Sequence, residues 1–192
     1  MGRTIVKVSR EQMAENRSRI LEEASRLFRA KGYDAVSVAE VMKACGLTHG
    51  GFYGHFASKD DLIAKSIEHV FAKSPEDPPD MRAYTEGYLS AAHRQNPARG
   101  CPMAALASET ARQSPMAQKA MTEGLETQIA RIASAYPQED PAAARRLAIG
   151  TWSAMVGAMI LARSSGAPGL ADEILRETRA WIDDGAGRPE PQ

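Results

Sequence analysis

The sequence predicts an all-α protein of about nine helices, and three observations support this fold class. Apolar residues recur at helical spacing along most of the 192 residues. No stretch alternates apolar and polar residues as a half-buried strand would. Prolines, glycines and capping serines separate the apolar stretches at short intervals. With 43% hydrophobic residues, the chain can bury a core as one large domain or two small ones.

The first helix is predicted to begin near Met13, after a polar and basic arm of about residues 1–12. One apolar stripe runs from Ile20 to Phe28 at positions that share a helix face. Gly32 follows the last turn, where glycine commonly ends a helix.

Two short helices are predicted next. Ser37 and Glu40 form a capping box at the start of the first, which ends at Gly46. The stretch from Leu47 to Leu62 holds three glycines, each of which costs a helix interior about 1 kcal/mol relative to alanine. A long helix, a capped short helix, a glycine turn and a second short helix are the order of a helix-turn-helix, whose second helix enters the major groove of DNA.

Aromatic residues orient that second short helix. Phe52 and Phe56 lie four residues apart and are predicted to face the core. The outward side then holds His49, Gly50, Gly51 and Tyr53. Packing does not explain an outward tyrosine on so short a helix, whereas a surface that lies against DNA does.

Ser58 is predicted to cap a long helix over residues 58–73, followed by a proline-rich linker. A disordered tail is predicted for residues 186–192. Five further helices are predicted over Met81–Arg94, Pro102–Arg112, Pro115–Ala135, Pro141–Arg163 and Leu170–Asp183.

Charge and cysteine content narrow the class of protein. The net charge is zero, but the first 73 residues carry 12 Lys and Arg against 9 Asp and Glu, while the remainder carries 12 against 15. This asymmetry favours a positive head on an acidic body. Two cysteines cannot build a disulfide framework. The longest apolar run is too short and interrupted to span a bilayer, so we expect a cytoplasmic protein with no membrane partner.

Four motifs lie at fixed spacing between Arg17 and Phe71: LFRAKG before the helix-turn-helix, the GL turn, FYGHF, and SKDDL. With these motifs the sequence resembles the DNA-binding domain of the TetR (tetracycline repressor) family of transcriptional regulators. The resemblance implies an all-helical homodimer that binds double-stranded operator DNA and a small-molecule effector, most often a repressor released by its ligand. It implies a DNA-binding domain over residues 1–57 and a ligand-binding and dimerisation domain over 58–185, with helix 58–73 connecting them.

The resemblance and the helix geometry together imply a set of DNA-contacting residues. Thr48 lies at the start of the recognition helix, where first-turn amides hold phosphate, and Lys59 matches a phosphate-binding lysine of the family. Basic residues of the arm, Arg3, Lys7 and Arg10, could also reach DNA. The full set is Arg17, Ser37, Thr48, His49, Gly50, Gly51, Tyr53, His55 and Lys59. Gly51 and Gly54 replace larger residues of the family pattern, which weakens base readout by side chains.

Bulky residues of the body are expected to divide between the core and an adaptable, apolar effector pocket. The pocket residues are expected to include Tyr84, Tyr88, Met103, Leu106, Met121, Leu125, Trp152 and Met155. Part of the surface of the last two helices is expected to form the dimer interface, drawn from Thr151, Ala154, Ala158, Ile174, Leu175, Thr178 and Trp181.

Two other interpretations stay open. Cys101 precedes Pro102 at a predicted helix N-cap, where the helix dipole lowers a thiol pKa, so a redox- or electrophile-sensing regulator is the alternative. A small buried residue is the simpler interpretation of this cysteine. A small helical enzyme is the third interpretation, with Glu109 and His93 as candidate groups in no shared motif. We expect no metal or cofactor, because the sequence has no matching ligand set or phosphate loop.

Overall fold

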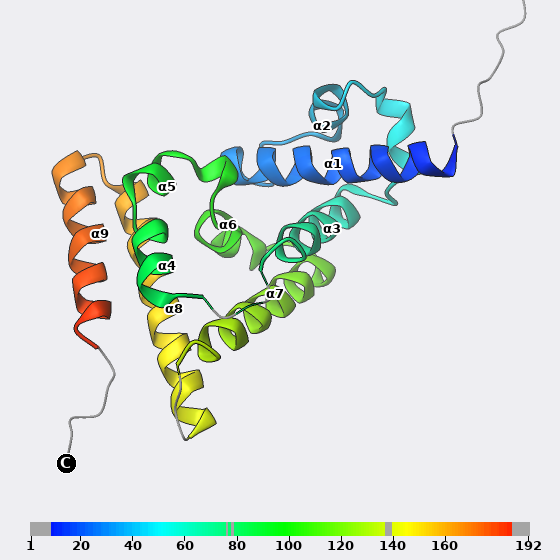
Figure 1. Ribbon diagram of the computed structural model, residues 1–192. Coiled ribbons are helices and arrows are strands. Elements are labelled where there is room, and N and C mark those ends of the chain that lie inside the picture. Colours follow the sequence, from blue (N-terminus) through cyan, green and yellow to red (C-terminus); the bar gives the residue numbers. More distant parts are fainter. Residues whose placement is uncertain (1–8, 76, 78, 137–139, 186–192) are drawn as a thin grey trace, which may run out of the picture.

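The structure, a computed structural model, describes residues 9–75, 77, 79–136 and 140–185. Within these ranges the chain forms nine α-helices and two 3-10 helices and no strand, which confirms the predicted all-α class (Figure 1). The elements are α1 Arg10–Lys31, α2 Val38–Ala44, η1 His49–Gly54, α3 Lys59–Phe71, α4 Met81–Tyr88, α5 Ala91–Gln95, η2 Pro97–Arg99, α6 Pro102–Thr110, α7 Pro115–Ala133, α8 Pro141–Ser164 and α9 Pro168–Asp183.

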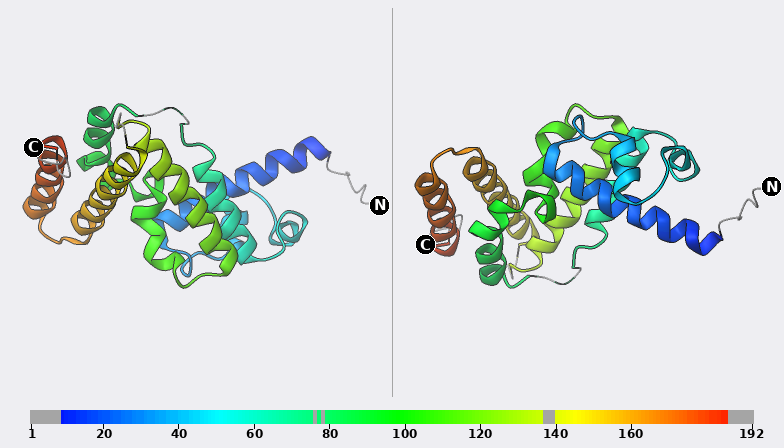
Figure 2. Two further views of the ribbon diagram at one scale, coloured as in Figure 1. Left: turned by 90° about the horizontal axis from the view of Figure 1, so that it is seen from below. Right: turned by 90° about the horizontal axis from the view of Figure 1, so that it is seen from above.

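The helices form a small head and a larger body joined by long helices. α2 and η1 lie on one side of α1 and form the head with it. α3 packs against both α1 and α7, α7 packs against α8, and α8 packs against α9. Figure 2 shows the α2–η1 segment and the α8–α9 pair at opposite ends of the molecule. One core of buried apolar residues runs through the head and the body.

Capping serines set the helix starts as predicted. The Oγ of Ser37 accepts the Glu40 N–H at 3.1 Å, and the Oγ of Ser58 accepts the Asp61 N–H at 3.1 Å. α1 begins at Arg10, because the Oγ of Ser9 caps it. The arm predicted over residues 1–12 is therefore helical in its last three residues. Its first eight residues, with Arg3 and Lys7, lie outside the described residues, as does the predicted disordered tail over 186–192.

The single helix predicted over Met81–Arg94 is wrong, because the chain leaves the helix at Leu89 (φ −86°, ψ 46°). The Oγ of Ser90 then accepts the His93 N–H at 3.2 Å and starts α5. Ser90 lies in a stretch whose apolar residues recur at helical spacing, and a serine there can either continue the helix or cap the start of a new one. The spacing of the apolar residues does not distinguish these two cases.

α8 also differs from expectation. Its 24 residues are long and apolar enough, by length and composition, to cross a membrane, and it is the one such helix among the described residues. Buried core helices meet the same criterion. α8 packs against α6, α7 and α9, with Ala148, Met155 and Met159 fully buried. Part of its apolar surface therefore belongs to the core, whereas Ile149, Ile160 and Leu161 are exposed.

Candidate functional sites

The exposed face of η1 is the outward surface that the aromatic spacing predicted. Phe52 and Phe56 are 1% and 2% exposed, and their rings stack with centroids 5.6 Å apart. Tyr53, between them, is 70% exposed. His49, Gly50 and Gly51 are exposed on the same short segment. The exposed face thus carries the side chains of Tyr53 and His49 and the bare backbone of Gly50 and Gly51.

The predicted recognition helix is a 3-10 helix of six residues. Its bonds run from i to i+3, from the Gly51 N–H to the Thr48 carbonyl at 3.0 Å and from the His55 N–H to the Phe52 carbonyl at 2.8 Å. Three glycines lower the preference for a regular α-helix here. Thr48 occupies the predicted N-cap position, but its hydroxyl makes no capping bond.

Arg17 holds η1 against α1. Its guanidinium stacks over the Phe56 ring, 4.3 Å from the centroid, and donates to the His55 carbonyl. Burial and the neighbouring Arg17 charge lower the pKa of His55. The Arg17 side chain, which sequence assigned to DNA, thus has contacts inside the head. Ser37 has one as well, since it caps α2, whereas Lys59 is half-buried at the start of α3.

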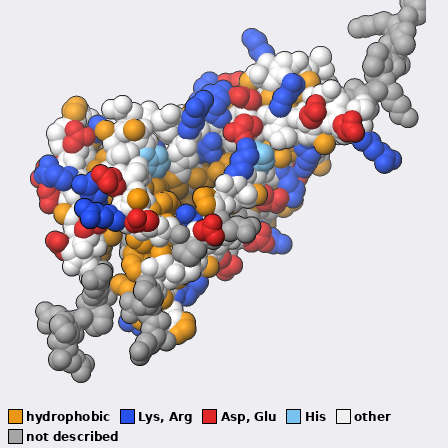
Figure 3. Space-filling view, viewed as in Figure 1, with side chains coloured by type: hydrophobic (Ala, Val, Ile, Leu, Met, Phe, Trp, Pro, Cys, Tyr) orange, Lys and Arg blue, Asp and Glu red, His pale blue; other side chains and the backbone are white. Residues whose placement is uncertain are grey.

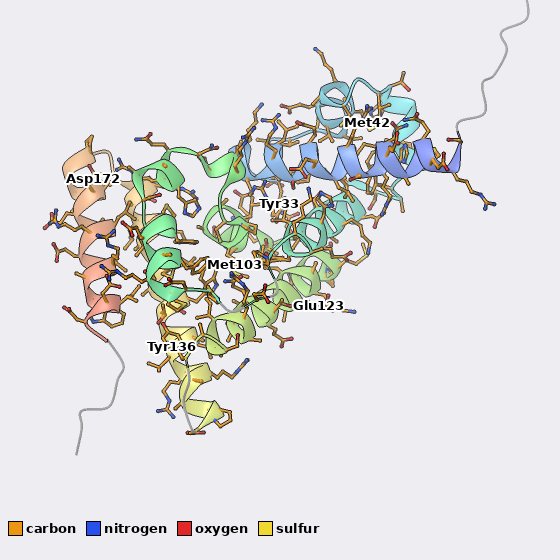
Figure 4. All side chains as sticks on the ribbon, viewed as in Figure 1. Tyr33, Met42, Met103, Glu123, Tyr136 and Asp172 are labelled. Carbon is orange, nitrogen blue, oxygen red and sulfur yellow. The ribbon has the colours of Figure 1, made fainter. Side chains whose placement is uncertain are left out.

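The head meets the body at Tyr33, which is 1% exposed. Its N–H donates to the Glu109 carboxylate at 2.8 Å, and its hydroxyl pairs with the Thr110 Oγ1 at 3.1 Å. Burial raises the pKa of Tyr33 to about 12. Gly32 has φ +85°, and a Cβ there would lie 2.7 Å from Glu109 Oε1. Figure 4 shows Tyr33 below α1, where the head approaches α6. The sequence suggested Glu109 only as a catalytic group and missed this junction.

A second link joins α1 to the segment between α5 and α6. The Arg29 Nε donates to the Ala98 carbonyl at 2.9 Å. That segment leads directly into Cys101 and the wall of a cavity, so the end of α1 contacts both the cavity segment and α6.

The cavity has a volume of about 370 Å³ and is bordered by α4, α5, α6, α7 and α8. Three aromatic side chains of its wall pack against one another. The rings of Tyr84 and Trp152 stack with centroids 6.3 Å apart, and the ring of Tyr88 meets that of Trp152 edge-on, with centroids 5.3 Å apart. Figure 3 shows hydrophobic side chains in the region between α4 and α7. His93, Arg99, Cys101 and Gln128 also line the cavity.

Three of the eight expected pocket residues, Tyr84, Tyr88 and Trp152, line this cavity. The other five do not. Met103 lies behind the wall, where its sulfur accepts the Trp152 Nε1–H at 3.2 Å, and Leu106 borders a separate small cavity beside Tyr33. Met121 and Met155 pack in the core, and Leu125 is 37% exposed. Helical spacing identifies the inward face of a helix but does not distinguish core residues from those of the cavity wall. Sequence analysis did not identify Arg99 and Gln128 as lining residues.

A larger open hollow of about 700 Å³ lies between α3 and α7. Glu68, Glu123 and Arg131 are among its lining residues, and none of the expected pocket residues is. Because charged side chains line it and the rings of Tyr84, Tyr88 and Trp152 do not, it is less suited to an apolar effector than the smaller cavity.

His93 and Tyr84, two of the polar residues that line the smaller cavity, are held in their neutral forms. The His93 Nδ1 donates to the Tyr88 carbonyl at 2.7 Å, and Nε2 accepts the Cys101 N–H at 3.0 Å, which fixes the neutral tautomer. Burial lowers the pKa of His93. Burial raises the pKa of Tyr84 to about 12, and Tyr84 accepts from Gln128 Nε2 at 3.0 Å.

Cys101 occupies the helix N-cap that sequence predicted, but the predicted lowering of its pKa is wrong. Burial raises the pKa of the thiol, and this effect exceeds the opposing contributions of the Tyr88 side chain, of the backbone amides of Ala104 and Met103 at the helix N-terminus, and of Arg163. The protonated thiol is the poorly reactive form, so the redox alternative is not favoured. His93 and Glu109 bind backbone amides in two different places, the cavity wall and the head–body junction. The described residues contain no group of three or more metal-ligating side chains.

A groove of about 500 Å³ runs between α8 and α9 on the outer surface. Leu161 and Trp181 line it and are 60% and 54% exposed. Of the expected interface residues, Ala154, Ala158, Ile174 and Thr178 also line this groove. Thr151 and Leu175 do not line it, and both are buried within the chain.

Comparisons with known proteins match both halves of the chain. A family model described as bacterial regulatory proteins, tetR family, matches residues 20–65. A second, described as the C-terminal domain of LmrA/YxaF-like transcriptional regulators, matches residues 80–169. Together the two matches cover the head, the cavity segment and most of the body.

Individual relatives match mainly in the head. The uncharacterized HTH-type regulator YerO of Bacillus subtilis is 37% identical over 62 residues, which is 32% of this chain and 22% of YerO. AcrR of Shigella flexneri is 38% identical over 60 residues, 31% of this chain and 28% of AcrR. YxaF of Bacillus subtilis is 28% identical over 109 residues, 50% of this chain and 57% of YxaF. The chain thus spans less than a third of the first of these relatives.

Solved structures share the whole fold. A TetR-family regulator from Cytophaga hutchinsonii aligns with a TM-score of 0.70 at 17% identity, over 93% of this chain and 97% of the other. The reduced form of Escherichia coli NemR aligns with a TM-score of 0.65 at 18% identity, over 88% and 96%. At such identities the likeness concerns the fold alone.

Proposed function

The chain belongs to the TetR family of transcriptional regulators, and on that premise we propose that it is a ligand-responsive repressor. In this proposal a homodimer binds a palindromic operator and a small molecule in the body releases it. The observation that carries the proposal is the pairing of an exposed Tyr53 face on the head with an aromatic cavity in the body. Residues 1–57 bind DNA, residues 58–185 bind effector and dimerise, and the protein acts in the cytoplasm.

Two features of the head support DNA binding: the exposed glycine backbone of η1 and the side chains that can contact phosphates or bases. Gly50 and Gly51 are exposed and carry no side chain, so the backbone of η1 can approach DNA closely. Tyr53 can lie against a thymine methyl or donate to a phosphate, and the Thr48 hydroxyl makes no capping bond that would compete with DNA. Lys59, half-buried at the start of α3, is the proposed phosphate contact of that helix. Arg17 acts mainly by holding η1 in position.

The groove around Leu161 and Trp181 supports dimerisation. Two large apolar side chains more than half exposed on one surface are typical of a protein–protein contact. A two-fold dimer buries the same surface of each copy and would set two heads at the spacing of successive major grooves, roughly 34–36 Å.

The Tyr33 junction supports coupling between effector and DNA. The segment from His93 to Pro102 borders the cavity, and the same segment and α6 hold the end of α1 through Arg29 and Glu109. Movement of the cavity wall therefore reaches α1, which carries η1. By linkage, the effector must lower operator affinity by the factor by which the operator lowers effector affinity.

Selection of bound sites from random DNA by the full chain tests this function. The expected result is a palindrome bound by two copies. Titration calorimetry with an effector found by screening against that operator then measures the coupling. Selection of no sequence would refute operator binding, and equal effector affinity with and without operator would refute coupling.

A further inference from the structure

Gln128 of α7 lines the aromatic cavity and is only 6% exposed. Its Nε2 donates to the Tyr84 hydroxyl at 3.0 Å. Its Oε1 accepts no hydrogen bond from the described residues, yet this oxygen is not one of the polar side-chain atoms that protein atoms enclose completely. The small open surface of the side chain therefore lies in the cavity, where the amide oxygen is free to accept a hydrogen bond from a ligand.

Tyr84 holds the amide in this orientation and is itself held from both sides. The Tyr84 ring stacks on Trp152 with 19° between the planes, and the Arg131 guanidinium lies over the ring, 5.3 Å from its centroid. The Arg131 Nε in turn donates to the Asp77 carbonyl at 3.0 Å. The acceptor is thus already in position before a ligand binds, which reduces the ordering cost of binding.

Other polar groups deep in the cavity wall already have partners or are closed off. The His93 Nδ1 donates to the Tyr88 carbonyl, and Nε2 accepts a backbone N–H. The Trp152 Nε1–H donates to the Met103 sulfur at 3.2 Å. The Tyr88 hydroxyl is enclosed by protein atoms. Hydrogen bonding to a ligand deep in the cavity therefore falls to the amide oxygen of Gln128.

The charges around the cavity favour a neutral donor on the ligand. Among the described residues that line the cavity there is no Asp or Glu, whereas the exposed Arg99 adds a positive charge. A buried cation without an opposite charge is costly, so an ammonium group is disfavoured. A carboxylate has no hydrogen to donate to Oε1. A neutral N–H or O–H meets the oxygen without either difficulty.

A ligand without a donor would displace water from the Gln128 oxygen and leave it unpaired. Such a loss reduces affinity, because a buried acceptor without a partner is unfavourable. A site that hydrogen-bonds its ligand therefore discriminates against an analogue that lacks the bonding group. The rings of Tyr84, Tyr88 and Trp152 supply an apolar wall against which the rest of a flat ligand can pack.

We propose that Gln128 determines which ligands the cavity selects, by accepting a hydrogen bond at Oε1 from a neutral N–H or O–H of a flat aromatic compound. This inference rests on the proposed function, since it names the chemistry of the effector. It refines the expectation of an apolar effector by adding one hydrogen-bond donor to an apolar body.

Titration calorimetry on the full chain with indole and benzofuran tests the donor requirement. The two compounds have nearly the same shape, but indole carries an N–H where benzofuran carries a ring oxygen. Wild type is expected to bind indole about tenfold more tightly than benzofuran. Gln128→Met keeps the length of the side chain and removes the amide. This variant is expected to lose the preference and to bind benzofuran at least as tightly as wild type does.

Two further variants serve as controls. Gln95→Met is the matched substitution at an exposed glutamine at the end of α5 that does not line the cavity, and it should keep the wild-type preference. Tyr84→Phe keeps the aromatic wall and removes the partner of Nε2, but it leaves Oε1 in place, so it should also prefer indole.

Three results would overturn the proposal: equal affinity of wild type for the two compounds, binding of neither, or an indole preference that survives in Gln128→Met. A preference of wild type for benzofuran would overturn it as well, because the amide would then present its N–H to the ligand in place of Oε1.

An operator-binding measurement with each compound distinguishes this inference from the proposed function. A preference for indole without release of operator would support ligand selection by Gln128 and refute release through this cavity. Operator binding by a protein that shows no preference for indole would refute the role of Gln128 alone.

Discussion

The Tyr33 N–H and the Glu109 carboxylate form a 2.8 Å hydrogen bond between the end of the DNA-binding head and helix α6 of the body. The donor belongs to a residue that is 1% exposed, so water cannot easily replace the acceptor. Gly32 leaves the space that lets the carboxylate approach. This bond is a direct polar link between the parts of the chain that the proposed function couples.

Glu109→Ala is expected to destabilise the fold by about 1–3 kcal/mol, because it leaves a buried N–H without an acceptor. Glu109→Gln keeps an acceptor and should lose less. Urea unfolding measures both, with Glu126→Ala on the exposed face of α7 as the control. A Glu109→Ala variant as stable as that control would show that the link contributes little.

Gly124→Ala is expected to cost about 1–3 kcal/mol, because the added Cβ would overlap the ring of Phe71 and force it to move. Gly150 is also inside a helix but has no atom within 4 Å of an added Cβ. Gly150→Ala should therefore gain up to about 1 kcal/mol from helix propensity. Thermal unfolding of the two variants should give shifts of opposite sign, and shifts of the same sign would contradict the packing of α3 on α7.

Tyr53→Ala and Lys59→Ala are each expected to weaken operator binding. Tyr53 is 70% exposed, so its loss should change stability by only about 0.5 kcal/mol or less. Removing the phosphate contact of Lys59 should also reduce the slope of log affinity against log salt by about 1. Lys119→Ala, an exposed lysine on α7, is the control for charge. Wild-type binding by both head variants would place the DNA-binding surface elsewhere.

Trp181→Glu and Leu161→Glu are expected to yield monomers, since each places a charge in the groove between α8 and α9. Sedimentation measures the oligomeric state, and operator affinity should fall with it. Leu170→Glu is the matched control, because Leu170 is 51% exposed on α9 but does not line the groove. Dimers in both groove variants would exclude this surface as the interface.

Stability is expected to fall as pH drops from about 7.5 to 5.5. The folded protein lowers the pKa values of His93 and His55 below 6.5, so the unfolded chain binds more protons in this window. Glu22, whose pKa is lowered from 4.5, affects stability only at lower pH. Urea midpoints at the two pH values should differ less in His93→Gln than in wild type. An equal difference in both proteins would exclude His93 as a source of the effect.

Residues close together in the sequence were sufficient to predict most helix boundaries and the face of η1 that is buried. Ser37 and Ser58 mark helix starts because their hydroxyls bind amides three residues away. Phe52 and Phe56 face inward because their spacing places them on one side. These relationships depend on neighbours in sequence, and residue spacing reports them directly.

The tertiary structure alone decided the sites that segments distant in sequence build. Trp152 and Met155 lie three residues apart on the same face of α8, yet Met155 packs in the core and Trp152 borders the cavity. The helices that pack against α8 at each position decide this difference, and residue spacing does not report it. The pKa of Cys101 rises because burial outweighs the helix N-terminus that sequence could see. Likewise, the bond from Tyr33 to Glu109 exists only after folding. The sequence by itself determined an all-helical regulator with a DNA-reading head, because local pattern encodes those features, whereas burial and long-range contact determined its cavity and its coupling.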